Sequence, residues 1–443
     1  MSELIETGKQ LVKQALKLGY DEVAILINRR ERSMIKLANS QPSVTQYWND
    51  ISYMLYLVKD KRIFIIEYKP EDTVVKPLEE ILKIADKVEE SPFYAPLPEP
   101  KPVKPIENLV DKKVIEYIRD PAELAEIALE AAHRKKIDYV AGTIDLWYNT
   151  RVLVTSKNVE LSEDSTGVQM YLRAFSEPDG SGQWCTASTF IDKKAIEEAA
   201  EIAADYAIRS KNRQSIEPGR YDLVLSPLVF GNLMNLVARM SSAFSILMGM
   251  SIFMKNRPGD TVASEKLTLS DTPRDPELPG ASSFDDEGVP TIDKPIIENG
   301  VLRTILHNIK TASKMGVEST GNAGWIYPRP WNLSIKPGDY SFEELVSEVK
   351  RGLLITNNWY TRLQNYVEGI FSTITRDALF LIENGEISKP VEKVRIADKI
   401  PKLLNNIEAL GKDLYRVMWW EVRIPSKIPY VLVKDINISK HLL

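Results

Sequence analysis

The sequence contains few of the side chains that bind transition metals. Its 443 residues include one cysteine, Cys185, and three histidines, His133, His307 and His441. A lone cysteine excludes an intramolecular disulfide framework and is typical of a reducing compartment. Because zinc sites draw most of their affinity from His and Cys, a zinc enzyme is hard to build from this chain alone.

Excess positive charge and long apolar runs are missing as well. The formal net charge is −5, which leaves no surplus of Lys and Arg to neutralise phosphates, so nucleic acid is not an expected partner. No window approaches about eighteen consecutive apolar residues, which predicts that no segment spans a membrane. The opening stretch "MSELIETGKQLVKQALKLGY" is amphipathic and lacks the apolar core of a secretory signal. We therefore predict a cytoplasmic protein.

The remaining composition is that of a folded chain with more than one domain, since 44% of the residues are hydrophobic and 27% are charged. Periodicity predicts an α+β fold. Two N-terminal regions share a plan of helix, strands and helix, and a strand-rich, barrel-like region with a few helices follows. The predicted parts are an N-terminal α+β domain at 1–95, a proline-rich linker at 91–110, a second α+β domain at 111–215 and a β-rich C-terminal domain at 216–443.

An apolar helix is predicted near the start of the C-terminal domain. Ser226 is a suitable N-cap and Pro227 fits the first helical position. Apolar side chains then recur at helical spacing as far as residue 248. We expect this helix to be buried in the core; the alternative is that its Met-rich end contacts another subunit.

The stretch "SSFDDEGVPTIDKPIIENG", residues 282–300, places Asp285, Asp286 and Glu287 directly before Gly288 in a segment that otherwise has the pattern of a strand. Three carboxylates are suitable ligands for a hard cation such as Mg²⁺ or Mn²⁺. Consecutive strand residues point to opposite faces, however, so they converge on one ion only if a turn bends them. We favour a structural turn over a cation site.

Two segments combine aromatic, Arg and amide side chains in a way that suits recognition of an extended peptide. They are "GWIYPRPWNLSI", residues 324–335, and "ITNNWYTRLQNYVEGIFS", residues 355–372. The alternative, equally favoured, is that their aromatic rings fill the core. The candidate peptide-binding residues are Arg329, Asn332, Asn357, Trp359, Tyr360, Arg362, Asn365 and Tyr366.

The C-terminal domain carries a specific resemblance. The run "SSFDDEGVPTIDKPIIENGVLRTILHNIKTASKMGVESTGNAG", residues 282–324, resembles the signature of the TldD/PmbA (TldE) family, whose members are also named modulators of DNA gyrase. In this family the TldD-type subunit resembles a zinc peptidase with an HExxxH helix, and the PmbA-type subunit pairs with it without carrying the metal. Aligned on the preceding "LVLSP", this chain reads "NLVARM" at 235–240. Asn235 and Met240 stand where the two His ligands are expected, and Leu236 stands where the general base is expected.

This resemblance implies a non-catalytic PmbA/TldE-type subunit of a cytoplasmic TldD-like zinc peptidase complex, which contributes to peptide binding and to the assembly interface. It implies no catalytic residue, no metal ligand and no cofactor in this chain, with zinc only in a TldD-like partner. Two alternatives stay open. One is a free-standing hydrolase that uses Asp285, Asp286 and Glu287 with a hard cation, and the other is a homodimeric peptide-binding scaffold. The acidic sequence does not favour direct contact with DNA.

Overall fold

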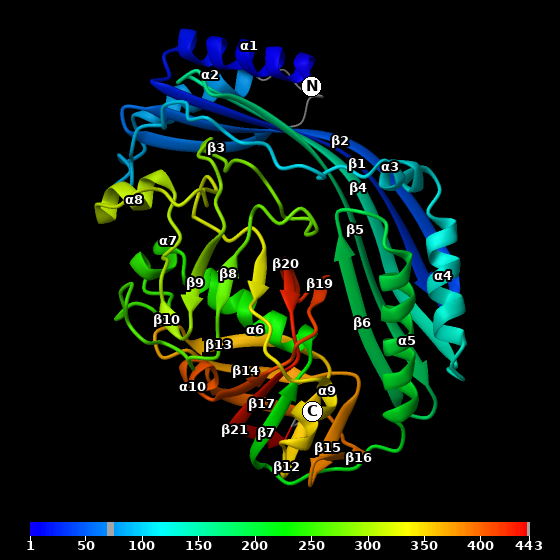
Figure 1. Ribbon diagram of the computed structural model, residues 1–443. Coiled ribbons are helices and arrows are strands. Elements are labelled where there is room, and N and C mark those ends of the chain that lie inside the picture. The colour runs from blue at the N-terminus through cyan, green and yellow to red at the C-terminus, as the bar shows by residue number, and fades with distance from the viewer. Residues whose placement is uncertain (69–74, 441–443) are drawn as a thin grey trace.

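The computed structural model describes residues 1–68 and 75–440. The N-terminal half is built on one long antiparallel sheet with the strand order β3-β2-β1-β4-β5-β6 (Figure 1). Its elements are α1 (Ser2–Leu18), β1 (Glu22–Ala38), β2 (Gln41–Lys59), β3 (Arg62–Tyr68), α2 (Val75–Ala85), α3 (Lys112–Arg119), α4 (Ala122–His133), β4 (Tyr139–Thr155), β5 (Glu160–Ser176), β6 (Gly180–Ser188) and α5 (Lys193–Arg209).

Strand β1 pairs with β4, so the two N-terminal regions share a single sheet. The sequence predicts the helix-strand plan of each region, but this pairing lies beyond it. The proline-rich segment at 91–110 contains no helix or strand. It lies against the sheet, where Leu97 is buried and its backbone N–H donates to the Glu22 carboxylate at 3.2 Å. The buried Cys185 lies in β6, where burial raises the pKa of its thiol to about 12.

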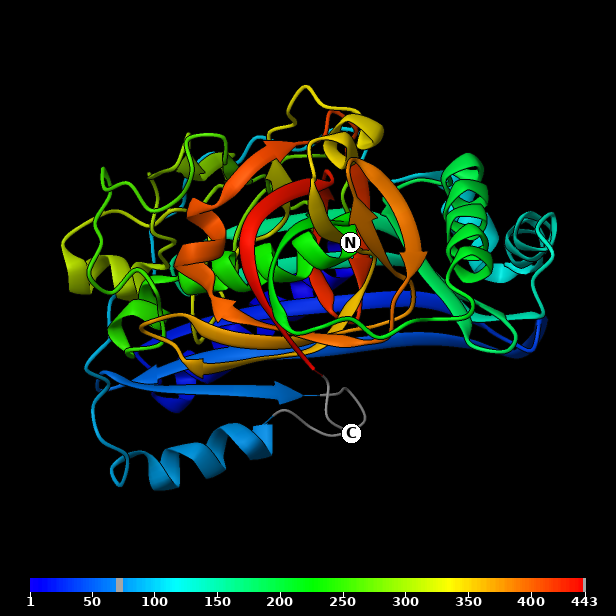
Figure 2. The ribbon, with the colours of Figure 1, turned by 90° about the horizontal axis from the view of Figure 1, so that it is seen from below.

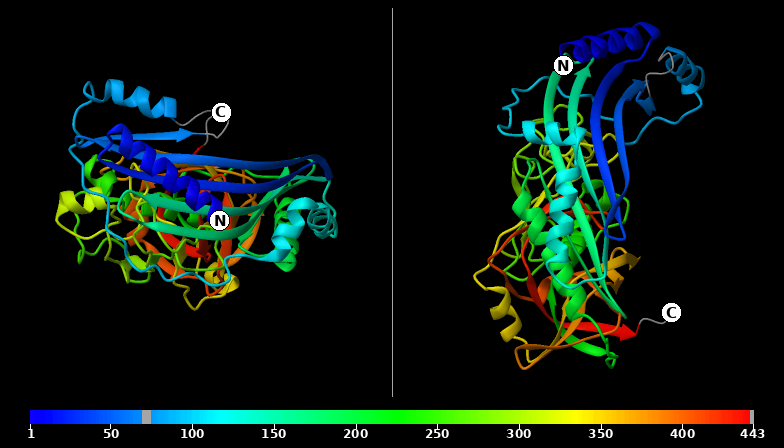
Figure 3. Two further views of the ribbon diagram at one scale, coloured as in Figure 1. Left: turned by 90° about the horizontal axis from the view of Figure 1, so that it is seen from above. Right: turned by 90° about the vertical axis from the view of Figure 1, so that its right-hand side faces the viewer.

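Successive side chains of a strand point to opposite sides, and along part of this sheet both faces are packed against other elements. Ile25 and Ile27 of β1 pack in the core under α1, whereas Leu26 points the other way and packs with Phe284 and Trp325 of the C-terminal region. The right-hand view of Figure 3 shows α4 and α5 side by side over the lower half of the sheet, with α1 across its upper end. The C-terminal region therefore lies on the inner face of a curved sheet.

The C-terminal region is strand-rich and contains a six-stranded sheet and a nine-stranded sheet, which confirms the predicted α+β class. The six-stranded sheet has the order β10-β9-β8-β11-β20-β19, and β7 and β21 lie at the centre of the other (Figure 2). The elements are β7 (Gly219–Leu225), α6 (Pro227–Met240), α7 (Ala243–Leu247), β8 (Leu269–Asp271), β9 (Lys294–Glu298), β10 (Val301–Leu302), α8 (Ile309–Met315), β11 (Leu333–Ile335), α9 (Phe342–Ser347), β12 (Arg351–Ile355), β13 (Asn358–Asn365), β14 (Ile370–Thr375), β15 (Leu379–Glu383), β16 (Glu386–Pro390), β17 (Val394–Lys399), α10 (Ile400–Asn405), β18 (Ile407–Leu410), β19 (Tyr415–Trp419), β20 (Val422–Ile428) and β21 (Val431–Lys440).

Helix α6 runs between the two C-terminal sheets and contacts β7, β19 and β20. Its start is the predicted one: the Ser226 side chain caps it and Pro227 occupies its first turn. The prediction of one helix over 227–248 is wrong, because α6 ends at Met240 and α7 is separate. The Ser241 hydroxyl donates to the Ala238 carbonyl at 2.7 Å, a local hydrogen bond that competes with continuation of the helix.

Residues 282–293 are also not strand, since only β9 at Lys294–Glu298 is regular there. The carboxylates before β9 accept hydrogen bonds from backbone N–H groups that a strand ladder would otherwise use. After β9 the chain turns at Asn299 and Gly300, both with positive φ, as is usual for a two-residue Asn-Gly hairpin turn. Within the part of the chain that is described, no helix is both long and apolar enough for a membrane crossing.

Candidate functional site

A continuous trough runs along α6 between β13, β20 and the inner face of the N-terminal sheet. Three cavities of about 320, 450 and 940 Å³ make it up, and Arg239 lines all three. The two smaller cavities form its central part, and the largest forms its wide part. The central part is lined by Asn232, Asn235, Leu236, Arg239, Met240, Ser245, Met250, Trp359, Tyr360, Thr361, Arg362, Leu363, Tyr366, Trp420, Glu421 and Arg423.

The wide part lies between the N-terminal sheet and the loops of the C-terminal region. Strands β1 and β4 contribute Leu26, Asn28 and Asn149, whose side chains share the inner face of the sheet. The segments 279–282 and 327–331 form the opposite wall. The N-terminal sheet therefore supplies one wall of the wide part, and the C-terminal region supplies the other.

Asn235 is fully used in holding α6 to β20. Its amide nitrogen donates to the Ile424 carbonyl at 3.3 Å and to the Ser426 hydroxyl at 3.2 Å, and its amide oxygen accepts from the Ile424 N–H at 2.8 Å. The side chain is 1% exposed. Both ends of the amide thus satisfy polar groups of the neighbouring strand, which uses both of its N–H donors and one lone pair of its oxygen.

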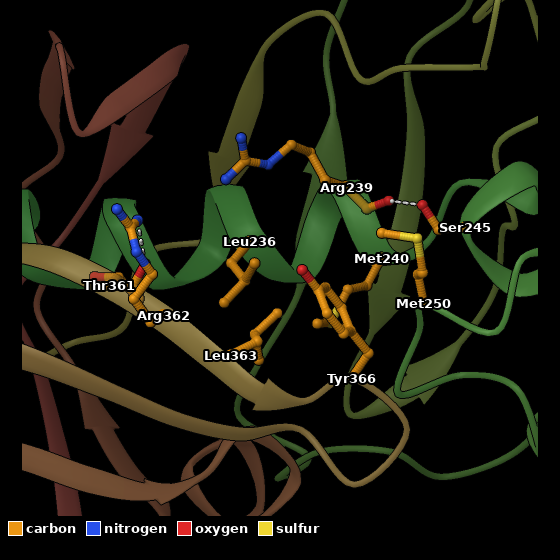
Figure 4. A pocket seen from close by; sticks show the side chains of 9 residues that line it. All are labelled: Leu236, Arg239, Met240, Ser245, Met250, Thr361, Arg362, Leu363 and Tyr366. Atoms are coloured by element: carbon orange, nitrogen blue, oxygen red, sulfur yellow. Dashed lines mark hydrogen bonds between the residues drawn. The ribbon is translucent and has the colours of Figure 1, made fainter.

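Leu236 and Met240 occupy the other two positions that correspond to HExxxH. Figure 4 shows them on the side of α6 that faces Leu363 and Tyr366 at the end of β13, with Arg239 leaving the helix on the opposite side. Leu236 has no ligand atom, and the thioether of Met240 is buried. Hard divalent ions and Zn²⁺ prefer oxygen, imidazole or thiolate ligands, so these three positions do not form a zinc site.

Three arginines face the central part of the trough without a carboxylate partner. Across residues 1–68 and 75–440, Arg239, Arg362 and Arg423 form no ion pair. Arg362 and Arg423 donate only to the backbone carbonyls of Thr361 and Trp420, each at 3.3 Å. Burial by the trough walls and the nearby charge of Arg423 lower the pKa of Arg239.

Cation–π contacts order the aromatic wall of the trough. The guanidinium carbon of Arg376 lies 5.4 Å from the ring centroid of Trp359 and 5.5 Å from that of Trp420. The guanidinium of Arg362 lies over the ring of Tyr360 at 4.2 Å. These contacts hold large, half-exposed rings along one side of the trough, where they offer flat apolar surface to a ligand.

The structure brings five of the eight predicted peptide-binding residues to the trough: Trp359, Tyr360, Arg362 and Tyr366 in its central part and Arg329 in its wide part. Trp359, Tyr360 and Tyr366 are each between 37% and 49% exposed. Their role in peptide binding stays a prediction.

The three predicted asparagines have other contacts. Asn332 is buried and binds the Gly280 N–H at 3.0 Å, and Asn357 is buried and donates to the Asp377 carboxylate at 2.7 Å. Asn365 accepts from the Glu368 N–H in the turn after β13. These amides form hydrogen bonds within the fold. The sequence does not distinguish such an amide from one that is free to bind a peptide.

Sequence reasoning missed Arg239, Trp420 and Arg423. Arg239 lies in the "NLVARM" stretch, where the sequence analysis considers only the metal-ligand positions. Trp420 and Arg423 lie in "MWWEVR" at 418–423. The sequence shows an arginine in each stretch but not whether it has a carboxylate partner in the fold. Only the packing of α6 against β20 brings Arg239 and Arg423 close to each other.

The acidic turn holds the C-terminal region against the N-terminal sheet. Asp285 is buried and accepts hydrogen bonds from the backbone N–H groups of Glu287, Val289 and Ala323, at 2.9–3.0 Å. Asp286 instead points to Arg151 of β4, with 2.5 Å between Oδ1 and Nη2. The two neighbouring carboxylates therefore point to different partners.

Glu287 takes a third direction and accepts from the N–H of Ile309, at the start of α8, at 2.8 Å. Burial, and next the charge of Asp285, raise the pKa of Glu287 to about 8. In the described part of the chain, no group of three or more His, Cys, Asp and Glu side chains is arranged to hold a metal ion. The geometry thus gives the hypothesis of a hard-cation hydrolase no support.

The histidines lie outside the trough. The imidazole Nε2 of His133 is 2.8 Å from the Ser40 hydroxyl, at the end of α4. His307 is buried, which lowers its pKa to about 4, and its Nδ1 has no hydrogen-bond partner among the residues described. His441 lies outside the described residues.

Comparison with known proteins identifies relatives of both halves of the chain. Residues 105–211 match the model of the PmbA/TldA metallopeptidase central domain, and residues 218–440 match that of the C-terminal domain. A metalloprotease of Methanothermobacter thermautotrophicus is 30% identical over 328 residues, which is 69% of this chain and 71% of that protein.

Two crystal structures share the fold over nearly their whole length. One is a Thermotoga maritima protein named as a candidate modulator of a DNA gyrase, with a TM-score of 0.86, 26% identity and coverage of 99% of this chain and 100% of that chain. The other is TldE from Thermococcus kodakarensis, with a TM-score of 0.82, 20% identity and coverage of 97% and 99%.

Proposed function

Because this chain belongs to the PmbA/TldD metallopeptidase family, we propose that it is a non-catalytic subunit, which holds extended peptide beside a TldD-like zinc peptidase subunit. The observation that carries the proposal is the set of side chains on α6. Where HExxxH would supply two imidazoles and a carboxylate, the chain has Asn235, Leu236 and Met240. An amide already bonded to β20, an aliphatic group and a buried thioether supply neither a metal ligand nor a general base.

The trough supports a role in substrate binding. Exposed aromatic rings, a continuous groove and polar side chains along its walls suit an extended chain whose apolar side chains stack and whose backbone needs hydrogen bonds. In this proposal the zinc and the water-activating carboxylate belong to the partner. The residues of this chain bind and orient the peptide.

An exposed apolar surface next to α7 supports contact with a partner chain. Met248, Met250 and Met254 are between 41% and 46% exposed, and Ile326 and Tyr327 are 61% and 51% exposed. The expected core burial applies to α6, whereas the Met-rich segment that follows it is open. Flexible methionines beside large apolar side chains are common at subunit contacts.

Co-purification from the source organism tests the proposal. We expect an affinity-tagged full-length chain to recover a TldD-like chain, with zinc in proportion to that partner. Met248→Asp should reduce the recovery because it places a charge in the contact surface. Val44→Asp, at a position of the same 43% exposure on β2, is the matched control and should leave recovery unchanged. Recovery of a homodimer alone, with no metal-bearing partner, would contradict the proposal in favour of a homodimeric scaffold.

A further inference from the structure

The central part of the trough has an unbalanced positive charge. Its charged side chains are Arg239, Arg362, Arg423 and Glu421, so three positive groups meet one negative group. Glu421 does not neutralise them through an ion pair, since its carboxylate accepts from the Tyr360 N–H at 3.2 Å. The chain as a whole carries a net charge of −5, so this local excess is opposite in sign to the protein.

An unpaired guanidinium is costly to hold in a partly closed groove. Burial and the charge of Arg423 both disfavour the charged form of Arg239, while few nearby groups compensate. A carboxylate that enters the groove would pair with the planar guanidinium groups in two-point hydrogen bonds, which are stronger than neutral ones. Three guanidinium groups without partners on the walls of one groove therefore indicate an anionic ligand.

The central part and the wide part of the trough differ in charge. In the wide part, Arg151 is paired with Asp286 at 2.5 Å and with Glu163 at 3.2 Å. Asp286 also lies 3.5 Å from Arg329. The other charged residues of this part are Arg239 and Arg423, which it shares with the central part, so the charges that belong to the wide part alone are largely balanced by contacts within the fold. All three unpaired arginines line the central part, beside the aromatic rings of Trp359 and Trp420, and Arg239 and Arg423 also line the adjoining wide part.

We infer that the central part of the trough binds the carboxylate groups of a peptide, with Arg239, Arg362 and Arg423 as the binding residues. This inference rests on the proposed role in peptide binding and names the substrate class: peptides with acidic side chains or a free C-terminus at this position. The aromatic wall receives the neighbouring side chains, and the rest of the peptide lies in the charge-balanced wide part.

A peptide fits this charge pattern better than a nucleic acid. A nucleic acid carries one negative charge at every nucleotide and needs a continuous track of cations. The carboxylates of Glu163 and Asp286 interrupt such a track in the wide part. A peptide concentrates its negative charge at a few positions, which matches the three unpaired arginines around the central part.

Fluorescence anisotropy with the full-length chain tests the inference. Four short peptides share one sequence except at three positions, which are all glutamate or all glutamine, and each version has either a free or an amidated C-terminus. All four carry a neutral fluorophore at the N-terminus. We expect the peptide with both kinds of carboxylate to bind, and the glutamine amide to bind at least about tenfold more weakly, since one charged hydrogen bond corresponds to about a tenfold change. The two intermediate peptides show whether side-chain or terminal carboxylates are bound.

Variants then locate the binding. Arg239→Gln and Arg423→Gln should each weaken binding of the acidic peptide about tenfold and leave binding of the glutamine amide unchanged. Arg257→Gln is the matched control, because Arg257 is an exposed arginine without an ion pair in the described chain and does not line the trough. Unfolding curves verify that each variant is folded. Salt titration of the unaltered chain is a second measurement. Added salt should weaken the binding of the acidic peptides more than the binding of the glutamine amide.

Equal binding of all four peptides would overturn the inference, as would no binding of any. Tighter binding of a single-stranded oligonucleotide than of the acidic peptide would also overturn it. Equal binding of all four peptides would overturn only the inference and leave the proposed role in peptide binding intact, whereas no binding of any peptide would also count against that role. The proposed zinc-bearing partner is tested separately by co-purification.

Discussion

Replacement of Asn235 by alanine tests whether this side chain is structural, as its contacts indicate. The change removes two donated hydrogen bonds and one accepted one between α6 and β20. Each lost hydrogen bond contributes about 1 kcal/mol net, and the Ile424 N–H left without its acceptor adds about 1–3 kcal/mol. Because the groups relax in part, we expect Asn235→Ala to lower the free energy of unfolding by about 2–4 kcal/mol.

Urea unfolding followed by tryptophan fluorescence measures this change, since Trp419 and Trp420 lie just before β20. Asn365→Ala is the control: Asn365 accepts one hydrogen bond in an exposed turn, and its loss should cost less than about 1 kcal/mol. Asn235→His, which restores one residue of HExxxH, should also be destabilising because imidazole cannot reproduce all three contacts. An Asn235→Ala variant as stable as Asn365→Ala, or more stable than the original chain, would refute the structural role.

Three further perturbations follow from the acidic turn and its neighbours. Folded Glu287 retains its proton up to a pKa of about 8, whereas the unfolded chain loses it near the ordinary value, so stability should fall between about pH 5 and 8 by up to about 1.4 kcal/mol per pH unit. In Glu287→Gln the free energy of unfolding, measured with urea at several pH values, should decrease less steeply over this range. The same dependence on pH in the variant and the original chain would contradict this prediction. Arg151→Met should cost about 3–5 kcal/mol because it removes the closer partner of buried Asp286, which keeps only the 3.5 Å contact with Arg329, whereas Arg303→Met breaks only an exposed pair with Glu298 and should cost less than about 1 kcal/mol. Similar losses from the two arginine variants would contradict this account. Gly288→Ala should cost about 1–3 kcal/mol more than Gly249→Ala, since both have positive φ but only at Gly288 would a Cβ lie 2.8 Å from Val159 Cγ1; equal losses would contradict the clash.

Local features of the fold were predictable where one short stretch of sequence determines them. Ser226 and Pro227 begin α6 because a hydroxyl caps the helix and proline needs no hydrogen-bond partner there. Asn299 and Gly300 form a hairpin turn because both tolerate positive φ. The end of α6 was not predictable, because the serines that end it bond to a carbonyl of the helix and to the Pro328 carbonyl far along the chain.

The arrangement of the sheet was beyond local reasoning. Strands β1 and β4 are separated by about a hundred residues, and alternation within each strand does not say which strands pair. That pairing places Leu26 and Asn149 on the inner face that closes the trough. The acidic turn was likewise read as one local feature, although its three carboxylates bond to three separate parts of the chain.

The trough was predictable in part. Trp359, Tyr360 and Arg362 lie within one stretch of four residues, which predicts that they act together, and all three line the trough. Arg239 and Arg423 come from a helix and a distant strand, and only their packing in three dimensions makes them neighbours. Buried asparagines are ambiguous in a sequence, because an amide used inside the fold and one offered to a ligand look alike.

Metal content and peptidase activity of the isolated full-length chain test the central claim most directly. The chain is expressed alone, exposed to excess zinc, desalted and analysed for bound metal, and its cleavage of unfolded casein is measured with and without a chelator. We predict far less than one zinc per chain and no chelator-sensitive cleavage. One tightly bound zinc per chain together with cleavage that the chelator abolishes would contradict the account.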